Sequence, residues 1–293
     1  MCASGLKATD AGTGPTPSDV SEFARSLSGL PRPQGYAHDD GWPDTGGADM
    51  NRRDLLTTVA AAALLTAETS SALVAAQPAT NSEPKSIRPL TPPPKGKIPV
   101  AFLVSTDAQV IDFAGPWEVF QDVHVRSRGT TMDEWMPFEL FTVAESTQPI
   151  RATGGLKIVP NYDFGSAPTP RLIVIPAQQD PSAATKEWLK RTAPLTDVTM
   201  SVCTGAFVLG SAGMLSGQAA TTHHDSYDEF AKAFPDVQLK RGVRFVENDK
   251  ISTAGGLTSG IDLALHVVER YFGADIAQRT AAFMEHESSR WKV

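Results

Sequence analysis

Short apolar runs alternate with segments of helical periodicity over the last two thirds of the chain. Four runs are apolar throughout or nearly so, as expected of strands that helices cover on both faces. They span residues 98–104, 138–143, 172–175 and 198–202. Two shorter apolar segments, 243–246 and 251–253, predict late strands. Between and after these strands, the spacing of apolar residues predicts helices at 181–192, 205–215, 261–272 and 274–285.

One further helix is expected after the first strand. Gly115 and Pro116 precede an amphipathic stretch, and proline suits the first turn of a helix, so this helix is predicted to open there. Strands that alternate with helices predict an α/β fold, a three-layer sandwich around a mostly parallel sheet. In such sheets the chemistry gathers beyond the carboxyl ends of the strands.

The first 96 residues have a different composition. Residues 1–49 are rich in Gly, Pro, Ser and Thr without an apolar period, which predicts a disordered extension. Residues 50–76 contain Arg52-Arg53, a short apolar run and a small-residue stretch, and they resemble a twin-arginine export signal. Residues 77–96 are a proline-rich linker. The folded domain is therefore expected over residues 97–293.

An export signal has to be N-terminal, yet 49 residues precede this one. We resolve this with the hypothesis that translation starts at Met50 and that residues 1–49 are an upstream extension of the reading frame. The alternative is an alanine-rich helix that follows a dibasic pair by coincidence. With the signal in use, the protein is expected in the periplasm or outside the cell. The apolar run is too short to span a bilayer as a stable helix, and we expect no stable membrane insertion after processing. An unused signal would leave the protein in the cytoplasm.

The overall composition is that of a soluble globular protein, with 293 residues, 41% hydrophobic and 20% charged. A net charge of -7 without a basic cluster argues against nucleic acid as a partner. The two cysteines, Cys2 and Cys203, are too few for a disulfide framework and lack the spacing of a zinc site. We therefore expect neither a metal nor a cofactor.

Cys203 follows a buried strand and precedes small residues that open a helix. A sharp strand-to-helix turn would lift its thiol off the sheet and over the free N–H groups of the helix. The helix dipole would then favour the thiolate, and the same N–H groups would hold an oxyanion. The alternative is that Cys203 is a small buried hydrophobic residue, a common fate of free cysteines.

Four motifs of the sequence resemble those of a known protein family. They read DFAGPWEVF at 112–120, SVCTGAFVLG at 201–210, ATTH at 220–223 and TAGGLTSGID at 253–262. In this order and spacing they resemble the ThiJ/PfpI superfamily, which has a flavodoxin-like, class I glutamine amidotransferase-like fold with a cysteine on a nucleophile elbow. The resemblance covers nearly all of residues 97–273. The most similar branch contains isonitrile hydratases and the sensor domains of arabinose-type transcription regulators.

The resemblance implies roles for individual residues. Cys203 matches the family nucleophile, and Asp112 matches the carboxylate that works beside the thiol as acid or base. Thr204 stands where the protease-like branch has a histidine, which removes support for peptidase activity. His223 lies where other branches place a third polar partner. His224 departs from the aromatic residue usual in hydratases, and at most one of two neighbouring histidines on a strand faces the thiol.

The oxyanion site shows a second departure. Where the family commonly has a Gly-Gly pair, this chain has Ala177, Gln178 and Gln179. The amides of Thr204 and of Ala177 or Gln178 are expected to stabilise a charged intermediate, and the Gln178 side chain is free to enter the pocket.

Two functions remain open from the sequence. The first is an exported, cofactor-free, cysteine-dependent hydratase or hydrolase that resembles isonitrile hydratase and acts on a small molecule. The second is a non-enzymatic module that binds a small ligand or senses oxidants through Cys203. The resemblance also implies a homodimer.

Overall fold

The computed structural model describes residues 88–292, and every structural statement concerns this part of the chain. The predicted extension (1–49), the twin-arginine-like segment (50–76) and the first half of the predicted linker lie outside the described residues. No helix within residues 88–292 is long and apolar enough to cross a membrane.

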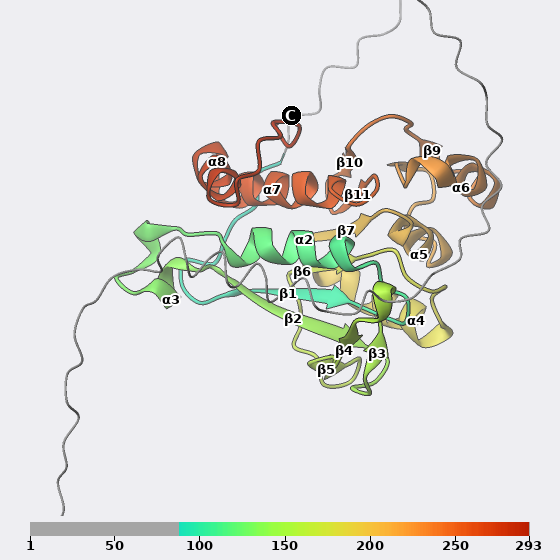
Figure 1. Ribbon diagram of the computed structural model, residues 1–293, viewed down its shortest axis with the longest axis horizontal. Coiled ribbons are helices and arrows are strands. Elements are labelled where there is room, and N and C mark those ends of the chain that lie inside the picture. Colours follow the sequence, from blue (N-terminus) through green and yellow to red (C-terminus); the bar gives the residue numbers. More distant parts are fainter. Residues whose placement is uncertain (1–87, 293) are drawn as a thin grey trace, which may run out of the picture. The chain divides into compact units, whose positions relative to one another are not determined.

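A seven-stranded sheet forms the centre of the domain (Figure 1), in the order β10-β11-β7-β6-β1-β2-β5. All neighbouring strands pair in parallel except β10 and β11, which form an antiparallel hairpin at one edge. The strands are β1 (Ile98–Leu103), β2 (Phe138–Ala144), β5 (Tyr162–Asp163), β6 (Leu172–Ile175), β7 (Val198–Val202), β10 (Phe245–Asn248) and β11 (Ile251–Ala254). The four long apolar runs of the sequence thus become the four central strands, as predicted.

Helices cover both faces of the sheet (Figure 1). The helices α2 (Val110–Gln121), α7 (Ser259–Phe272) and α8 (Ala274–Phe283) share one apolar core with one face of the sheet. The helices α4 (Ala183–Thr192), α5 (Gly205–Ser211) and α6 (Tyr227–Ala233) bury their apolar side chains in a second core on the opposite face. This arrangement confirms the predicted three-layer α/β sandwich.

Several short elements complete the described chain. They are the helix α3 (Met132–Trp135), the two-stranded sheets β3 (Ile150–Arg151) with β4 (Lys157–Ile158) and β8 (Ala219–Ala220) with β9 (Gln238–Leu239), and 3-10 turns at Arg126–Arg128, Thr153–Gly155, Ala193–Leu195 and His224–Ser226.

The start of α2 corrects the sequence prediction. The helix begins at Val110 rather than at Gly115, so Pro116 lies inside it. A proline there leaves the carbonyl of Asp112 without its usual helical donor. Gly115 and Pro116 contribute to packing instead, because Gly115 lies against Ile261 of α7 and Pro116 is buried. Because of this earlier start, Asp112 belongs to the first turn of α2 and not to the end of the strand.

Residues 88–96 lie against the domain and belong to no helix or strand. The Leu90 amide donates to the Arg270 carbonyl oxygen at 2.8 Å, and side chains of Arg128 and Arg171 donate to backbone carbonyls of this segment. Leu90 also packs on the core that contains α2 and α7. The packed part of the chain therefore begins before the predicted boundary at Lys97.

The sheet has a topological switch point between β1 and β6. The helix that follows β1 covers one face, whereas the helix that follows β6 covers the other. Chains that leave adjacent strands toward opposite faces open a crevice at the carboxyl ends of the strands, where α/β proteins bind ligands. Asp112 and Cys203 come from the segments beside this crevice.

Candidate active site

Cys203 follows β7 directly, on a strained turn that Thr204 connects to α5. Its φ of 60° lies in the left-handed region that a non-glycine residue rarely adopts. Hydrogen bonds to neighbouring segments fix the turn. The Cys203 amide donates to the Gly255 carbonyl at 2.9 Å. In addition, the buried Thr222 hydroxyl donates to the Cys203 carbonyl at 3.0 Å. Such a turn is the geometry of a nucleophile elbow.

Gly205 allows α5 to start close to the neighbouring strand. A Cβ on Gly205 would overlap the backbone carbonyl oxygens of Ile175 and Pro176, which cannot rotate away as a side chain would. We expect Gly205→Ala to lower the free energy of unfolding by about 1–3 kcal/mol, measured by urea denaturation. The matched control is Gly165→Ala, because a Cβ there meets only ordinary contacts. Equal stability of the Gly205→Ala protein and the wild type would contradict this packing.

The Asp112 carboxyl lies next to the elbow and is fully buried. Its Oδ2 accepts a hydrogen bond from the Ala177 amide at 3.1 Å, whereas its Oδ1 is buried without a hydrogen-bond partner among residues 88–292. Burial raises the pKa of Asp112 from 3.8 to about 6, although the Ala177 amide, the Cys203 thiol and the Leu257 amide act to lower it. A carboxyl with this pKa can take up and release a proton near neutral pH.

The Cys203 thiol is not the thiolate that the helix dipole alone would favour. Only 7% of the residue is exposed. Burial and the neighbouring Asp112 charge together raise the pKa of the thiol to about 11, and the Thr204 and Leu257 amides only partly offset this. The sequence expectation of an ionised resting thiol is therefore wrong. In the resting site the proton stays on sulfur, beside a carboxylate able to accept it.

The structure gives the Ala177 amide a different partner from the expected oxyanion. Its N–H points to Asp112 Oδ2 and orients that carboxyl. The neighbouring Gln178 has a buried Oε1 without a hydrogen-bond partner among residues 88–292. Thr204, the residue before α5, places its amide near the Cys203 sulfur. The expected oxyanion role of Thr204 stays compatible with this geometry, whereas the Ala177 amide is already occupied.

The two histidines differ in their surroundings. His223 is half-buried, and its ring lies directly over Gly256, where a Cβ would overlap it. His224 is exposed, and its ring lies 4.3 Å from that of His223. Within the described part of the chain, the His223 ring accepts a hydrogen bond from the Asp225 amide, and no bond joins the ring to Cys203. Its predicted role as a third polar partner stays a prediction, and His223 is the better placed of the two.

A loop that sequence reasoning did not assign to the site closes it on one side. Residues 255–258 join β11 to α7, and the Gly255 carbonyl accepts the Cys203 amide. Leu257 has a φ of 52°, and its amide lowers the pKa of both Asp112 and Cys203. A left-handed non-glycine residue leaves no obvious trace in a single sequence, so no signal pointed to this amide.

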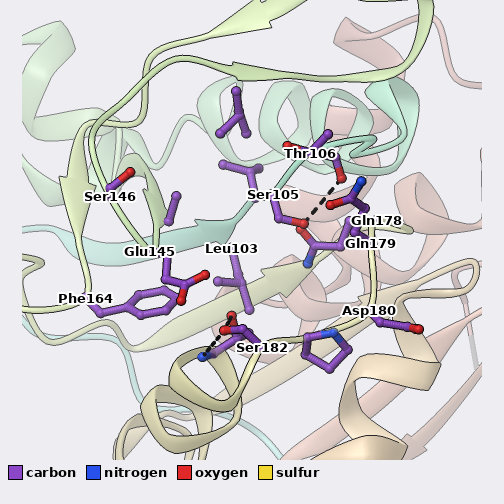
Figure 2. A pocket seen from close by; sticks show the side chains of 15 residues that line it. Leu103, Ser105, Thr106, Glu145, Ser146, Phe164, Gln178, Gln179, Asp180 and Ser182 are labelled. Carbon is purple, nitrogen blue, oxygen red and sulfur yellow. Dashed lines mark hydrogen bonds between the residues drawn. The ribbon is translucent and has the colours of Figure 1, made fainter.

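A cavity of about 310 Å³ opens at the switch point (Figure 2). Its walls come from the ends of β1, β2 and β6, and Figure 2 shows Glu145 and Phe164 on one side of it and Thr106, Gln178 and Gln179 on another. Cys203 and Asp112 do not line it. Gln178 lines this cavity and directly follows Ala177, whose amide donates to the Asp112 carboxyl.

One group of side chains in the described region has the spacing of metal ligands. His223, His224 and Asp225 each offer one atom, and these atoms lie within 4.8 Å of one another. Two of the three side chains are largely exposed. These three side chains thus form a surface group, and the group does not include the buried pair of Cys203 and Asp112.

These features define a class: an α/β protein with a cysteine on a strained strand-to-helix turn and a buried carboxyl beside it. Residues 99–270, more than half of the chain, match the DJ-1/PfpI family. The chain therefore belongs to the DJ-1/PfpI family, which confirms the ThiJ/PfpI resemblance of its motifs.

Individual relatives refine this assignment. The chain is 28% identical over 192 residues to the isonitrile hydratase of Pseudomonas putida, across 64% of this chain and 78% of that protein. It is 27% identical over 135 residues to the HTH-type transcriptional regulator CdhR of Pseudomonas aeruginosa, across 44% of this chain and 39% of the regulator. Among solved structures, a THiJ/PfpI family protein from Pseudomonas syringae superposes with a TM-score of 0.57 at 24% identity, covering 74% of this chain and 84% of that one.

Proposed function

We propose that the protein is a cysteine-dependent hydratase that adds water to a small isonitrile. The observation that carries the proposal is the buried Asp112 carboxyl beside the elbow cysteine, with a pKa of about 6 next to a protonated thiol. At neutral pH this carboxyl is mostly ionised and can serve as the general base for the thiol. The similarity to an isonitrile hydratase supports this substrate class.

The reaction divides into two additions at one carbon. In the first, the Cys203 sulfur bonds to the terminal carbon of R–N≡C while Asp112 takes the thiol proton and returns it to that carbon. The product is the thioimidate R–N=CH–S–Cys203. In the second, water adds to the same carbon, its proton reaches the nitrogen, and the C–S bond breaks with Asp112 again relaying a proton to sulfur. The net change is R–N≡C plus water to R–NH–CHO, without an oxidant or cofactor.

The surrounding amides support both steps. Charge that develops on the substrate during attack needs donors fixed before the reaction. The Thr204 and Leu257 amides already act on the sulfur, so they lie where charge forms. Oδ1 of Asp112 has no partner among residues 88–292, which leaves it free for the proton in transit. We propose that His223 supports the 255–258 loop through its contact with Gly256.

A ligand-sensing module is the second candidate. The matches to transcription regulators favour it, but the chain spans only 39% of the length of CdhR and 54% of that of the regulator GbdR. Reversible oxidation of Cys203 is the weaker form of this candidate, because oxidation follows thiolate character and the pKa of this thiol is raised to about 11.

Export stays a separate proposal. It depends on Arg52-Arg53 and the apolar run that follows, in a region outside the described residues. A mature N-terminus near Gln77, found by mass measurement of the protein from its native host, supports export. An intact chain that retains residues 1–49 contradicts it.

The test of function is a turnover assay with n-butyl isonitrile, in which NMR follows the formyl proton of the product. A hydratase releases N-butylformamide in amounts far above the enzyme concentration. The sensor candidate predicts no formamide at all. A stable adduct at Cys203 without product would also exclude the hydratase.

A further inference from the structure

A buried ionic cluster lies behind the loop that closes the candidate site. Its centre is Asp262, in the first turn of α7, whose side chain is completely buried. Asp262 Oδ2 accepts from the Arg244 guanidinium at 2.6 Å, and Oδ1 pairs with His286 Nε2 at 2.9 Å. Both carboxylate oxygens therefore have partners, as a buried charge requires.

Arg244 holds the loop at both of its ends. The loop, residues 255–258, begins where the Gly255 amide donates to the Arg244 carbonyl at 2.8 Å. It ends at Thr258, whose hydroxyl accepts from Arg244 Nη2 at 3.2 Å. One residue thus fixes the first and last members of a four-residue loop, and its guanidinium is anchored in turn on Asp262.

His286 ties the other oxygen of Asp262 to the C-terminal segment. This residue follows α8, its amide donates to the Ala281 carbonyl at 2.8 Å, and only 17% of its side chain is exposed. The cluster therefore joins three separate parts of the chain: the residue before β10, the start of α7 and the segment after α8. Two partners on one buried carboxylate restrict its position more than one would.

The loop itself touches each main group of the candidate site. The Gly255 carbonyl accepts from the Cys203 amide at 2.9 Å. Gly256 lies under the His223 ring. Between these contacts and Thr258, the strained Leu257 directs its amide toward Asp112 and Cys203. A left-handed leucine persists only where its surroundings over-determine the backbone.

We infer that Arg244, anchored by Asp262 and His286, is a positioning residue that holds the 255–258 loop against the Cys203 elbow. Its guanidinium touches neither Cys203 nor Asp112, so its effect on the site passes through the backbone of the loop. This inference rests on the proposed function only for its kinetic consequence. The mechanical consequence, a loop that loosens when the guanidinium is lost, applies to an enzyme and a sensor alike.

The test compares Arg244→Ala with Arg241→Ala in the full chain. Arg241 lies three residues earlier and pairs with the exposed Asp228, so it is a surface control. We expect Arg244→Ala to speed hydrogen exchange of the Cys203 amide and alkylation of Cys203 by iodoacetamide at least about tenfold, because the 255–258 loop no longer stays against the elbow. Arg241→Ala should change neither rate by more than about twofold.

Chemical rescue separates positioning from general damage. The lost guanidinium leaves a partly exposed space beside Asp262, so about 20 mM methylguanidinium should restore slow exchange and slow alkylation in Arg244→Ala. Methylammonium at the same concentration, which cannot bridge Asp262 and Thr258, should not. If the protein turns over n-butyl isonitrile, kcat falls at least about tenfold while KM changes by less than about threefold.

A second variant covers the case in which Arg244→Ala does not fold. Thr258→Val removes only the acceptor for Arg244 Nη2 and keeps the Asp262 pair, and it should speed both rates by about two- to threefold. The inference is overturned if a folded Arg244→Ala protein keeps the wild-type rates of amide exchange and alkylation, or if Arg241→Ala speeds these two rates equally. If Arg244→Ala is unfolded, unchanged rates in Thr258→Val overturn the inference. Absence of turnover with altered exchange and alkylation would refute the hydratase and leave the inference intact.

Discussion

Cys203→Ala should reduce the turnover of n-butyl isonitrile at least about a thousandfold, because the covalent route requires the sulfur. Cys203→Ser should be nearly as inactive, since an alcohol is far harder to ionise than a thiol and Asp112 is only a weak base. The assay is the release of N-butylformamide under substrate saturation, with far-UV circular dichroism to show that each variant is folded.

The matched control for this prediction is Ser201→Ala. Ser201 lies on β7, two residues before Cys203, and its buried hydroxyl has no partner among residues 88–292. Replacing an unpartnered buried hydroxyl by hydrogen should leave activity within about threefold of the wild type. Turnover that survives Cys203→Ala would show that the chemistry does not pass through this thiol.

Asp112→Asn should have the second largest effect, a loss of about a hundredfold to ten-thousandfold in kcat, because the amide cannot take the thiol proton. In the wild type, the rate should rise with pH through the Asp112 pKa of about 6, where the carboxylate forms. The residual rate of Asp112→Asn should lack this rise. A variant with wild-type kcat, or with the same rise near pH 6, would remove Asp112 from the mechanism.

The same variant should be more stable than the wild type. The folded protein binds the Asp112 proton more tightly than the unfolded chain, because burial raises its pKa from 3.8 to about 6. The unfolded carboxyl therefore ionises first as pH rises, and folding stability of the wild type falls between about pH 4 and pH 6. Above this window Asp112→Asn should gain about 1–3 kcal/mol in urea denaturation, whereas the two proteins should be similar below it. A wild type more stable than the variant at neutral pH would contradict the burial cost.

Much of the fold was predictable because its signals are local. The central strands are continuous apolar runs, and burial on both faces of a parallel sheet explains why they lack alternation. A sharp turn at Cys203 was predicted from its place between such a strand and the small residues that open a helix, and the structure gives Cys203 a left-handed φ of 60° there. The start of α2 was placed wrongly, since Pro116 suggested a first turn while tertiary packing against α7 carries the helix through it.

The electrostatics of the site were not predictable from the sequence. Helix-dipole reasoning favoured a thiolate, but burial and the Asp112 charge dominate and raise the pKa of Cys203. The role of the Ala177 amide depends on a contact across 65 positions of sequence. Likewise, the cluster of Arg244, Asp262 and His286 joins residues that only the folded chain brings together.

The proposed mechanism requires the Asp112 carboxyl to act directly on the Cys203 thiol. The most direct measurement is the pH dependence of Cys203 alkylation by iodoacetamide in the wild type and in Asp112→Asn, both without substrate. Because the Asp112 charge helps to raise the thiol pKa to about 11, we expect a lower pKa for alkylation, and faster alkylation at about pH 9, in Asp112→Asn. Identical profiles in the two proteins would contradict the account, since they would mean that the two side chains do not sense each other.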